Sequence, residues 1–343
     1  LEVLASEHPI PVPHDRLFTQ LKYVAINGSN VRGYQLPQMC PERIEHLDIE
    51  GFPADFSWAA FSAGSGNQAI EFPKLKSLRV VYGKGYVNDK VASPCLDGHS
   101  WALRFPVLKD LTVSCLGSTC PLLENAVYPE PETVAISASP AIYRFLATTA
   151  LSAARRLTLS LPRQYDVDAS ALAVVNGILS RAGACKEREL DVGGQALYFT
   201  PEDITCTGLT QLRVTALVDV DTMLELISRL PRLAYLTLTD LILDDFQSDI
   251  SIPESVEHDP VPPLDTAITR LSITMRELES CMVADLVVKC MLLRMPTLTD
   301  LEVVGLPEMP IMDFVDDYCQ WYPHLAHVDI ALEAEDRYWY LSE

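Results

Sequence analysis

Hydrophobic residues recur along this chain in one phrase of constant spacing: an apolar residue, a proline, and then Leu-x-x-Leu-x-apolar. Its clearest copy runs from Phe72-Pro73 through Leu75 and Leu78 to Val80. The phrase ends in period-two alternation, which predicts a short strand with one buried side. Strong and degenerate copies cover the chain, and we mark each by the first apolar residue of its alternation. These markers are Val24, Leu47, Leu78, Leu111, Val134, Leu157, Leu190, Leu212, Leu236, Leu271, Leu301 and Val328.

The spacing of these markers indicates a repeat protein. Their mean separation is (328 − 24)/11, about 28 residues, which is typical of leucine-rich repeats. Since one short strand cannot bury its apolar side alone, the copies are expected to stack into a parallel sheet. Segments 170–182, 221–230, 280–294 and 312–321 have helical spacing between markers.

The predicted fold is therefore α/β: a leucine-rich-repeat solenoid of about 12 irregular repeats, forming a single domain over residues 1–343. We expect a curved horseshoe with the parallel sheet on its concave face and the helices on its convex face. Two insertions interrupt it. Residues 82–104 are rich in glycine and aromatic residues, and residues 243–266 are rich in acidic residues and proline. The second has two readings, a solvated projecting loop or a docking segment for a basic partner.

A polar column follows from the same alignment. The residue between the last two apolar positions of each copy is never a large aliphatic one, as expected if it faces away from the core. These residues and their neighbours on the concave side are the candidate partner-binding positions. We select Tyr23, His46, Asp48, Arg79, Asp191, Arg213, Tyr235, Arg270, Glu302 and Asp329. Tyrosine and arginine are the types that most often anchor interfaces. For each position, the alternative is an ordinary solvated strand residue.

Composition narrows the class of partner. Lys and Arg number 26 against 47 Asp and Glu, a formal net charge of −21. Such an excess repels phosphate, so we expect neither nucleic acid nor an anionic membrane as partner. No apolar run reaches the length of a membrane span, about 18 residues. The acidity itself has two explanations: solubility, or a basic protein partner.

The cysteines and the N-terminus suggest where the protein works. Nine cysteines are scattered without any CxxC spacing, which favours reduced, buried thiols in the cytoplasm or nucleus. The chain begins at Leu1 without a signal-peptide pattern, so we expect it to be a fragment of a longer protein.

Catalytic motifs were sought and not found. The sequence contains no phosphate-binding glycine loop, no GxSxG elbow and no HExxH helix. Cys319, His324 and His327 have a loosely metal-like spacing, but they fall on different elements and a fourth ligand is missing. We therefore predict no cofactor, no metal and no enzymatic activity. An unrecognised catalytic site on the concave face is a remote alternative, and it would need convergent titratable groups.

The phrase at 72–80 and 105–113 resembles the leucine-rich-repeat region of fungal F-box-type proteins, particularly uncharacterised members from early-diverging fungi. Residues 34–78, 201–238 and 289–330 look similar as well. The resemblance implies a non-catalytic protein–protein interaction scaffold, the substrate-recognition region of an F-box-type ubiquitin ligase. It also implies an adaptor-binding module, which we expect upstream because residues 1–20 are short and proline-rich. The alternative is a ligase-independent adaptor that binds a basic protein through its acidic surface.

Overall fold

The computed structural model describes residues 3–6, 19–27, 39–52, 69–82, 102–115, 120, 122–123, 126–127, 131–146, 154–162, 169–182, 185–193, 204–215, 220–241, 263–275, 292, 294–306, 322 and 324–332. The chain forms two compact units, and we describe each by itself. Unit 1 comprises Leu1–Pro162 and Arg181–Lys186, and unit 2 comprises Arg163–Ser180 and Glu187–Glu343. The sequence predicted a single repeat domain, which stays a prediction.

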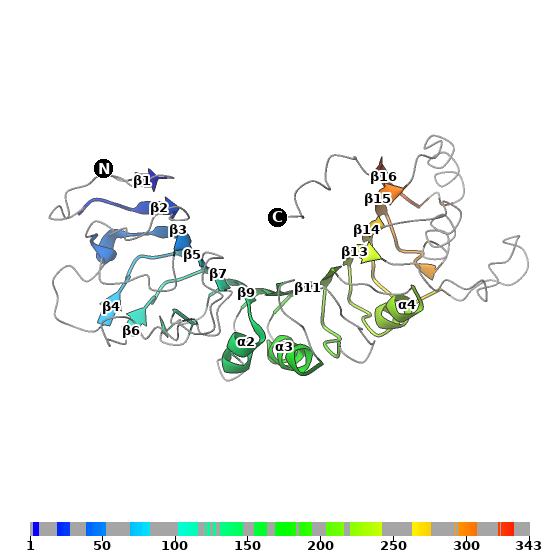
Figure 1. Cartoon of the computed structure of the whole chain (residues 1–343), viewed down its shortest axis with the longest axis horizontal. Helices are drawn as coiled ribbons and strands as arrows, with labels where there is room; N and C mark the ends of the chain where they lie inside the picture. Colours follow the sequence, from blue (N-terminus) through cyan, green and yellow to red (C-terminus); the bar gives the residue numbers. More distant parts are fainter. Residues whose placement is uncertain are drawn as a thin grey trace, which may run out of the picture. The chain divides into compact units, whose positions relative to one another are not determined.

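The main sheet of unit 1 is parallel at every pairing (Figure 1). Its strands, in spatial order, are β1 (Val3–Ser6), β2 (Tyr23–Asn27), β3 (His46–Phe52), β5 (Ser77–Tyr82), β7 (Asp110–Cys115), β9 (Thr133–Ala138) and β10 (Arg156–Leu161). β1 precedes the first sequence marker and was not predicted. It pairs Leu4 with Val24, so it continues the same register.

The second layer of unit 1 differs from the prediction. Besides η1 (Pro41–Arg43) and α2 (Pro140–Leu146), it contains a parallel sheet of β4 (Ala69–Glu71), β6 (Ala102–Arg104) and β8 (Ala126–Val127). Residues 102–104 therefore belong to a strand, whereas the sequence assigned them to an insertion. Strands of two or three residues carry no detectable period, although Ile70 of β4 and Leu103 of β6 are buried. Tyr82, the first residue of that insertion, ends β5, and residues 83–101 lie outside the described residues.

The sheet of unit 2 is also parallel at each of its pairings. Its strands, in spatial order, are β11 (Glu187–Gly193), β12 (Gln211–Thr215), β13 (Tyr235–Leu241), β14 (Arg270–Met275), β15 (Asp300–Leu306) and β16 (His327–Leu332). The helices α3 (Ala169–Arg181) and α4 (Val220–Ser228) confirm two predicted helices to within two residues at each end. The predicted helix at 280–294 apart from residues 292 and 294, the predicted helix at 312–321, and most of the insertion at 243–266 lie outside the described residues.

The strand register agrees with the sequence alignment throughout both sheets. In unit 1, Val24, Leu47, Leu78, Leu111, Val134 and Leu157 are successive register partners. In unit 2, the same holds for Leu190, Leu212, Leu236, Leu271, Leu301 and Val328. All of these except Val328 are at most 2% exposed. The predicted parallel alignment is therefore confirmed, and the chain is α/β with parallel sheets and few described helices.

Helices in both units bury apolar residues. In unit 2, Leu172, Val175 and Leu179 of α3 and Leu226 and Ile227 of α4 are fully buried. The α3 residues are spaced three and four apart, which places them on one helix face, and these faces supply the apolar surface that one side of the strands requires.

In unit 1, α2 is joined to the sheet by a buried tyrosine. The Tyr143 hydroxyl oxygen lies 2.7 Å from the carbonyl oxygens of both Ile136 and Ser160, and it accepts the Ser160 N–H at 3.0 Å. Ile136 belongs to β9 and Ser160 to β10, so a single side chain bridges two neighbouring strands. Tyr143 itself is fully buried.

The residues two before each marker form an edge row at which the strands begin. In each described pair, a backbone carbonyl in this row accepts N–H groups from the next strand, as Lys22 does from Glu45 at 2.8 Å and His46 at 3.0 Å. Unit 2 reinforces the row with threonine, since the Thr210 hydroxyl donates to the Arg188 carbonyl at 3.1 Å. Unit 1 uses charged side chains instead, and an ion pair joins Lys76 to Glu45 at 2.6 Å.

Candidate interaction surface

Each sheet exposes the side opposite its buried markers, and we call this side the polar face. It consists mainly of the residues immediately before and after each marker. In unit 1 these are Tyr23, His46, Ser77, Asp110, Thr133 and Arg156, with Ala25, Asp48, Arg79, Thr112, Ala135 and Thr158. In unit 2 they are Glu189, Gln211, Tyr235, Arg270, Asp300 and His327, with Asp191, Arg213, Thr237, Ser272, Glu302 and Asp329. All of them are at least partly exposed.

The ten predicted binding residues all lie on these polar faces, divided between the two units. Tyr23, His46, Asp48 and Arg79 lie on the adjacent strands β2, β3 and β5 of unit 1. The others occupy the consecutive strands of unit 2, one to a strand: Asp191, Arg213, Tyr235, Arg270, Glu302 and Asp329. Whether they bind a partner stays a prediction.

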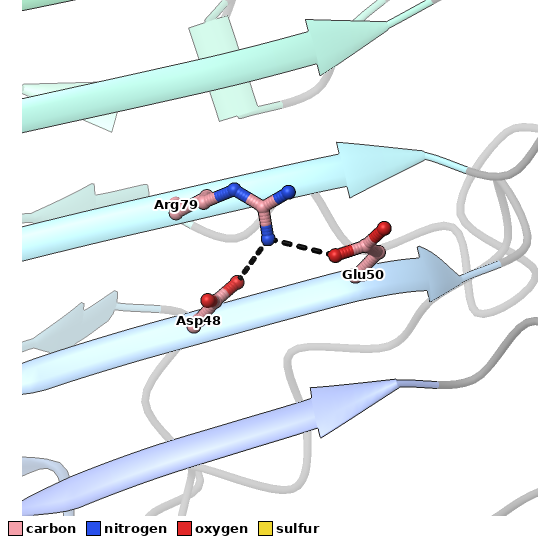
Figure 2. A network of polar contacts seen from close by, with 3 residues as sticks. All are labelled: Asp48, Glu50 and Arg79. Carbon is pink, nitrogen blue, oxygen red and sulfur yellow. Dashed lines mark hydrogen bonds and ion pairs between the residues drawn. The ribbon is translucent and has the colours of Figure 1, made fainter. Parts of the chain in front are cut away.

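The charged residues of unit 1 form a closed ion triplet, shown in Figure 2. A single guanidinium nitrogen of Arg79, Nη1, donates to a carboxylate oxygen of Asp48 and to one of Glu50, both at 2.8 Å. Asp48 and Glu50 point the same way because they are two residues apart on β3. Immediately after them, Gly51 has a φ of 73°, and the register with β5 shifts between Glu50 and Phe52. Glycine adopts this left-handed conformation without the usual side-chain penalty.

The triplet neutralises Arg79 within the protein. The hydrogen bonds from Glu50 and Asp48 raise the pKa of the Arg79 guanidinium, so it stays charged at every pH at which the protein works. The three side chains are 35–45% exposed, so solvent screens each pair, and each contributes at most about 1 kcal/mol. The triplet carries a net charge of −1. Its chemistry is therefore that of a weakly acidic, internally paired patch.

Next to the triplet lies an aromatic pair. The rings of Tyr23 and His46 have centroids 6.0 Å apart and planes tilted by 37°. Tyr23 is 40% exposed, which is high for a side chain of its size on a sheet. Its exposed ring offers a flat apolar contact at the β2 end of the polar face.

The polar face of unit 2 carries a different arrangement, centred on β13. Tyr235 is 46% exposed and is the register partner of Arg270 on β14. Arg213 lies on the other neighbouring strand, β12. Both arginines are exposed, and among the described residues no carboxylate lies within 4.0 Å of either guanidinium. Tyrosine between two unpaired arginines is a composition common at protein interfaces.

Beyond this basic centre, the face becomes acidic. Asp300 and Glu302 lie on β15, and Asp329 lies on β16. The Asp300 carboxylate accepts the Thr299 hydroxyl at 2.7 Å, which orients it at the strand start. Asp300 is the register partner of Arg270, yet it bonds to Thr299 and leaves the guanidinium available.

Other chemistry is not assembled in the part of the chain that the structure describes. There, no group of three His, Cys, Asp or Glu side chains is placed to hold a metal ion, and Cys319 lies outside the described residues. Among the described cysteines, Cys115, Cys120, Cys185 and Cys206 are buried, as their apolar surroundings predicted. No described helix is both long and apolar enough to cross a membrane.

The binding residues selected from the sequence omit one member of the ion triplet. Glu50 was not selected as a binding residue, although it contributes equally with Asp48 to the Arg79 triplet. Its position two residues after Asp48 on a predicted strand was the available signal. What the sequence could not show was that Arg79 on the next strand would extend toward both carboxylates. No family model, no curated protein and no solved structure matches this chain.

Proposed function

We propose that this chain is a leucine-rich-repeat solenoid that acts as a non-catalytic protein-binding scaffold through its polar faces. The regular parallel register of equivalent positions in each unit supports the repeat assignment. Burial on one side of strands β2, β3, β5, β7 and β9–β15 leaves the other side as an array of polar side chains. Such arrays suit partner binding because rigid strands hold many side chains in a known order.

The observation that carries this proposal is the position of the exposed aromatic residues. Among the described residues, the large hydrophobic side chains that are exposed are Tyr23, Tyr235 and Val107. Both tyrosines lie on polar faces, one in each unit. Tyrosine rings that are 40–46% exposed add less to the stability of a sheet than buried rings do, whereas at an interface tyrosines are among the strongest anchors. Their location favours binding over a merely soluble outer surface.

The ubiquitin-ligase form of this proposal is supported by the resemblance of the Phe-Pro-x-Leu-x-x-Leu phrase alone. It states that the polar faces hold a substrate while a separate module recruits the ligase core. Co-precipitation of the full-length protein with a ligase core complex tests it. Absence of the ligase core from a precipitate that contains a polar-face partner would favour a ligase-independent adaptor.

The scaffold proposal is tested by quantitative capture from an extract of the source organism. The test variant is Arg213→Glu with Arg270→Glu, which changes the polar face of unit 2. The matched control is Arg181→Glu with Arg232→Glu, which makes the same change in net charge at exposed sites off that face. We expect at least one protein to be captured by the wild type and the control and lost from the test variant. Identical capture by all three chains would reject the polar face of unit 2 as a binding surface.

A further inference from the structure

The polar face of unit 2 has a charge order that restricts its partner. Neighbouring strands in a sheet lie about 4.8 Å apart, so the six strands place their side chains at regular intervals across the face. Along this series of strands, Arg213 on β12 and Arg270 on β14 have no carboxylate partner among the described residues. Between these strands, β13 carries Thr237 beside Arg213 and Tyr235 beside Arg270. Asp300 and Glu302 follow at β15 and Asp329 at β16, and on the opposite side Glu189 and Asp191 lie on β11, with Asp191 the register partner of Arg213.

The separation of the two charge blocks follows from the strand spacing. The basic block is centred on β13 and the acidic block lies midway between β15 and β16, which is two and a half strand steps away. The distance between the blocks is therefore about 12 Å. An extended peptide advances about 3.3 Å per residue, so four residues span about 13 Å. A partner segment of ordinary length matches both blocks at once.

A uniformly basic partner does not fit this face. Lysines placed over Glu302 and Asp329 would be attracted, but further lysines over Arg213 and Arg270 would be repelled, because neither guanidinium has a carboxylate partner among the described residues. Unit 1 differs here, since Asp48 and Glu50 already neutralise Arg79. The net charge of −21 applies to the chain as a whole, and it does not describe the centre of this face, where Arg213 and Arg270 lie.

We propose that the polar face of unit 2 binds a protein segment of bipolar charge. Its acidic side chains lie over Tyr235 between Arg213 and Arg270, and its basic side chains lie about four residues away over Glu302 and Asp329. This inference rests on the proposed scaffold function, and it names the chemistry of the partner. The recognition is electrostatic and ordered, so the sequence of charges in the segment matters more than its composition.

The test uses synthetic peptides that carry a benzophenone photo-crosslinker next to the acidic block. The probe is Glu-Glu-Ser-Gly-Lys-Lys, and its reverse is included because the charges do not set the chain direction. The composition control is the shuffled peptide Glu-Lys-Ser-Gly-Glu-Lys. Crosslinks to the whole chain are located and quantified by mass spectrometry, which detects weak binding that equilibrium titration would miss.

We expect one of the two block peptides to label the polar face of unit 2 about tenfold more than the shuffled peptide. Arg213→Glu with Arg270→Glu should remove this preference, and so should Glu302→Lys with Asp329→Lys. The second variant should also gain labelling by an all-glutamate peptide, since lysines then stand at positions 302 and 329. Arg181→Glu with Arg232→Glu should keep the wild-type pattern.

Equal labelling by the block and shuffled peptides would overturn the inference, as would stronger labelling by an all-lysine peptide. Labelling located off the polar face would overturn it too. These failures are separable from failure of the scaffold proposal. If capture from extract depends on Arg213 and Arg270 while the peptides show no charge order, the scaffold stands and the bipolar partner is rejected.

Discussion

Removing the hydroxyl of Tyr143 perturbs the fold of unit 1 at one defined point. This oxygen lies 2.7 Å from the carbonyls of Ile136 and Ser160 and 3.0 Å from the Ser160 amide nitrogen. Its single proton serves one carbonyl at a time, while a lone pair accepts the Ser160 N–H. The substitution Tyr143→Phe keeps the ring and its packing, and it leaves a backbone donor and an acceptor without this partner.

The expected loss of stability follows from these contacts. A buried polar group left unsatisfied costs about 1–3 kcal/mol. Two groups are affected, but Ser160 is only part-buried, so water partly replaces the hydroxyl there. We therefore expect Tyr143→Phe to lower the free energy of unfolding by about 1–3 kcal/mol. For a unit of this size, that corresponds to about 2–4 °C in the melting temperature per kcal/mol.

The assay combines urea unfolding with native-state hydrogen exchange at the Ser160 amide. The matched control is Tyr23→Phe, which deletes the same atom from a ring that is 40% exposed and should change stability by less than about 0.5 kcal/mol. Exchange at Ser160 should accelerate only in the Tyr143 variant. If both variants have wild-type stability and Ser160 exchange is unchanged, the hydroxyl does not join α2 to β9 and β10.

Three further predictions concern other parts of the fold. The hydrogen bond from Lys76 lowers the pKa of Glu45 below its ordinary 4.5. The ionised carboxylate therefore stabilises the fold above its unfolded-state pKa, and this contribution is lost as pH falls through the folded-state pKa. An NMR titration should show a Glu45 midpoint below 4.5 that rises in Lys76→Met; an unchanged midpoint would contradict the ion pair. Asn176 is 2% exposed, and its side-chain oxygen accepts the Thr205 N–H at 3.3 Å. Asn176→Leu should therefore lower the free energy of unfolding, measured by thermal unfolding, by about 1–3 kcal/mol. A neutral result would mean that this contact is dispensable. Leu212→Ala should cost about 2–5 kcal/mol by urea unfolding, because the marker position is buried in the core, whereas a cost below about 1 kcal/mol would argue against the register.

Much of the fold could be predicted from the sequence because its elements are encoded locally. The phrase around Leu78 places a proline, a buried apolar residue and an alternating strand within nine residues, and the other copies repeat this pattern. The period of two then decides which residues are buried, so the polar column could be identified without coordinates. Helices α3 and α4 were predicted for the same reason, from an apolar spacing of three and four residues.

The parts that sequence did not predict depend on partners from elsewhere in the chain. β4, β6 and β8 are too short to show a period, and they exist because Ile70 and Leu103 find a shared core. β1 was missed because its own sequence shows no repeat pattern, and only its pairing with β2 identifies it as a strand of the sheet.

The candidate surface likewise depends partly on the local sequence and partly on the tertiary structure. The sequence by itself determined that Arg79, Arg213 and Arg270 would all lie on the polar side of strands, because side-chain direction alternates along a strand whatever surrounds it. Only the tertiary structure decided that Arg79 is neutralised by Asp48 and Glu50, while Arg213 and Arg270 have no carboxylate in reach among the described residues. Ion pairing depends on which side chains meet across neighbouring strands and which rotamers they adopt, and no local pattern encodes that meeting.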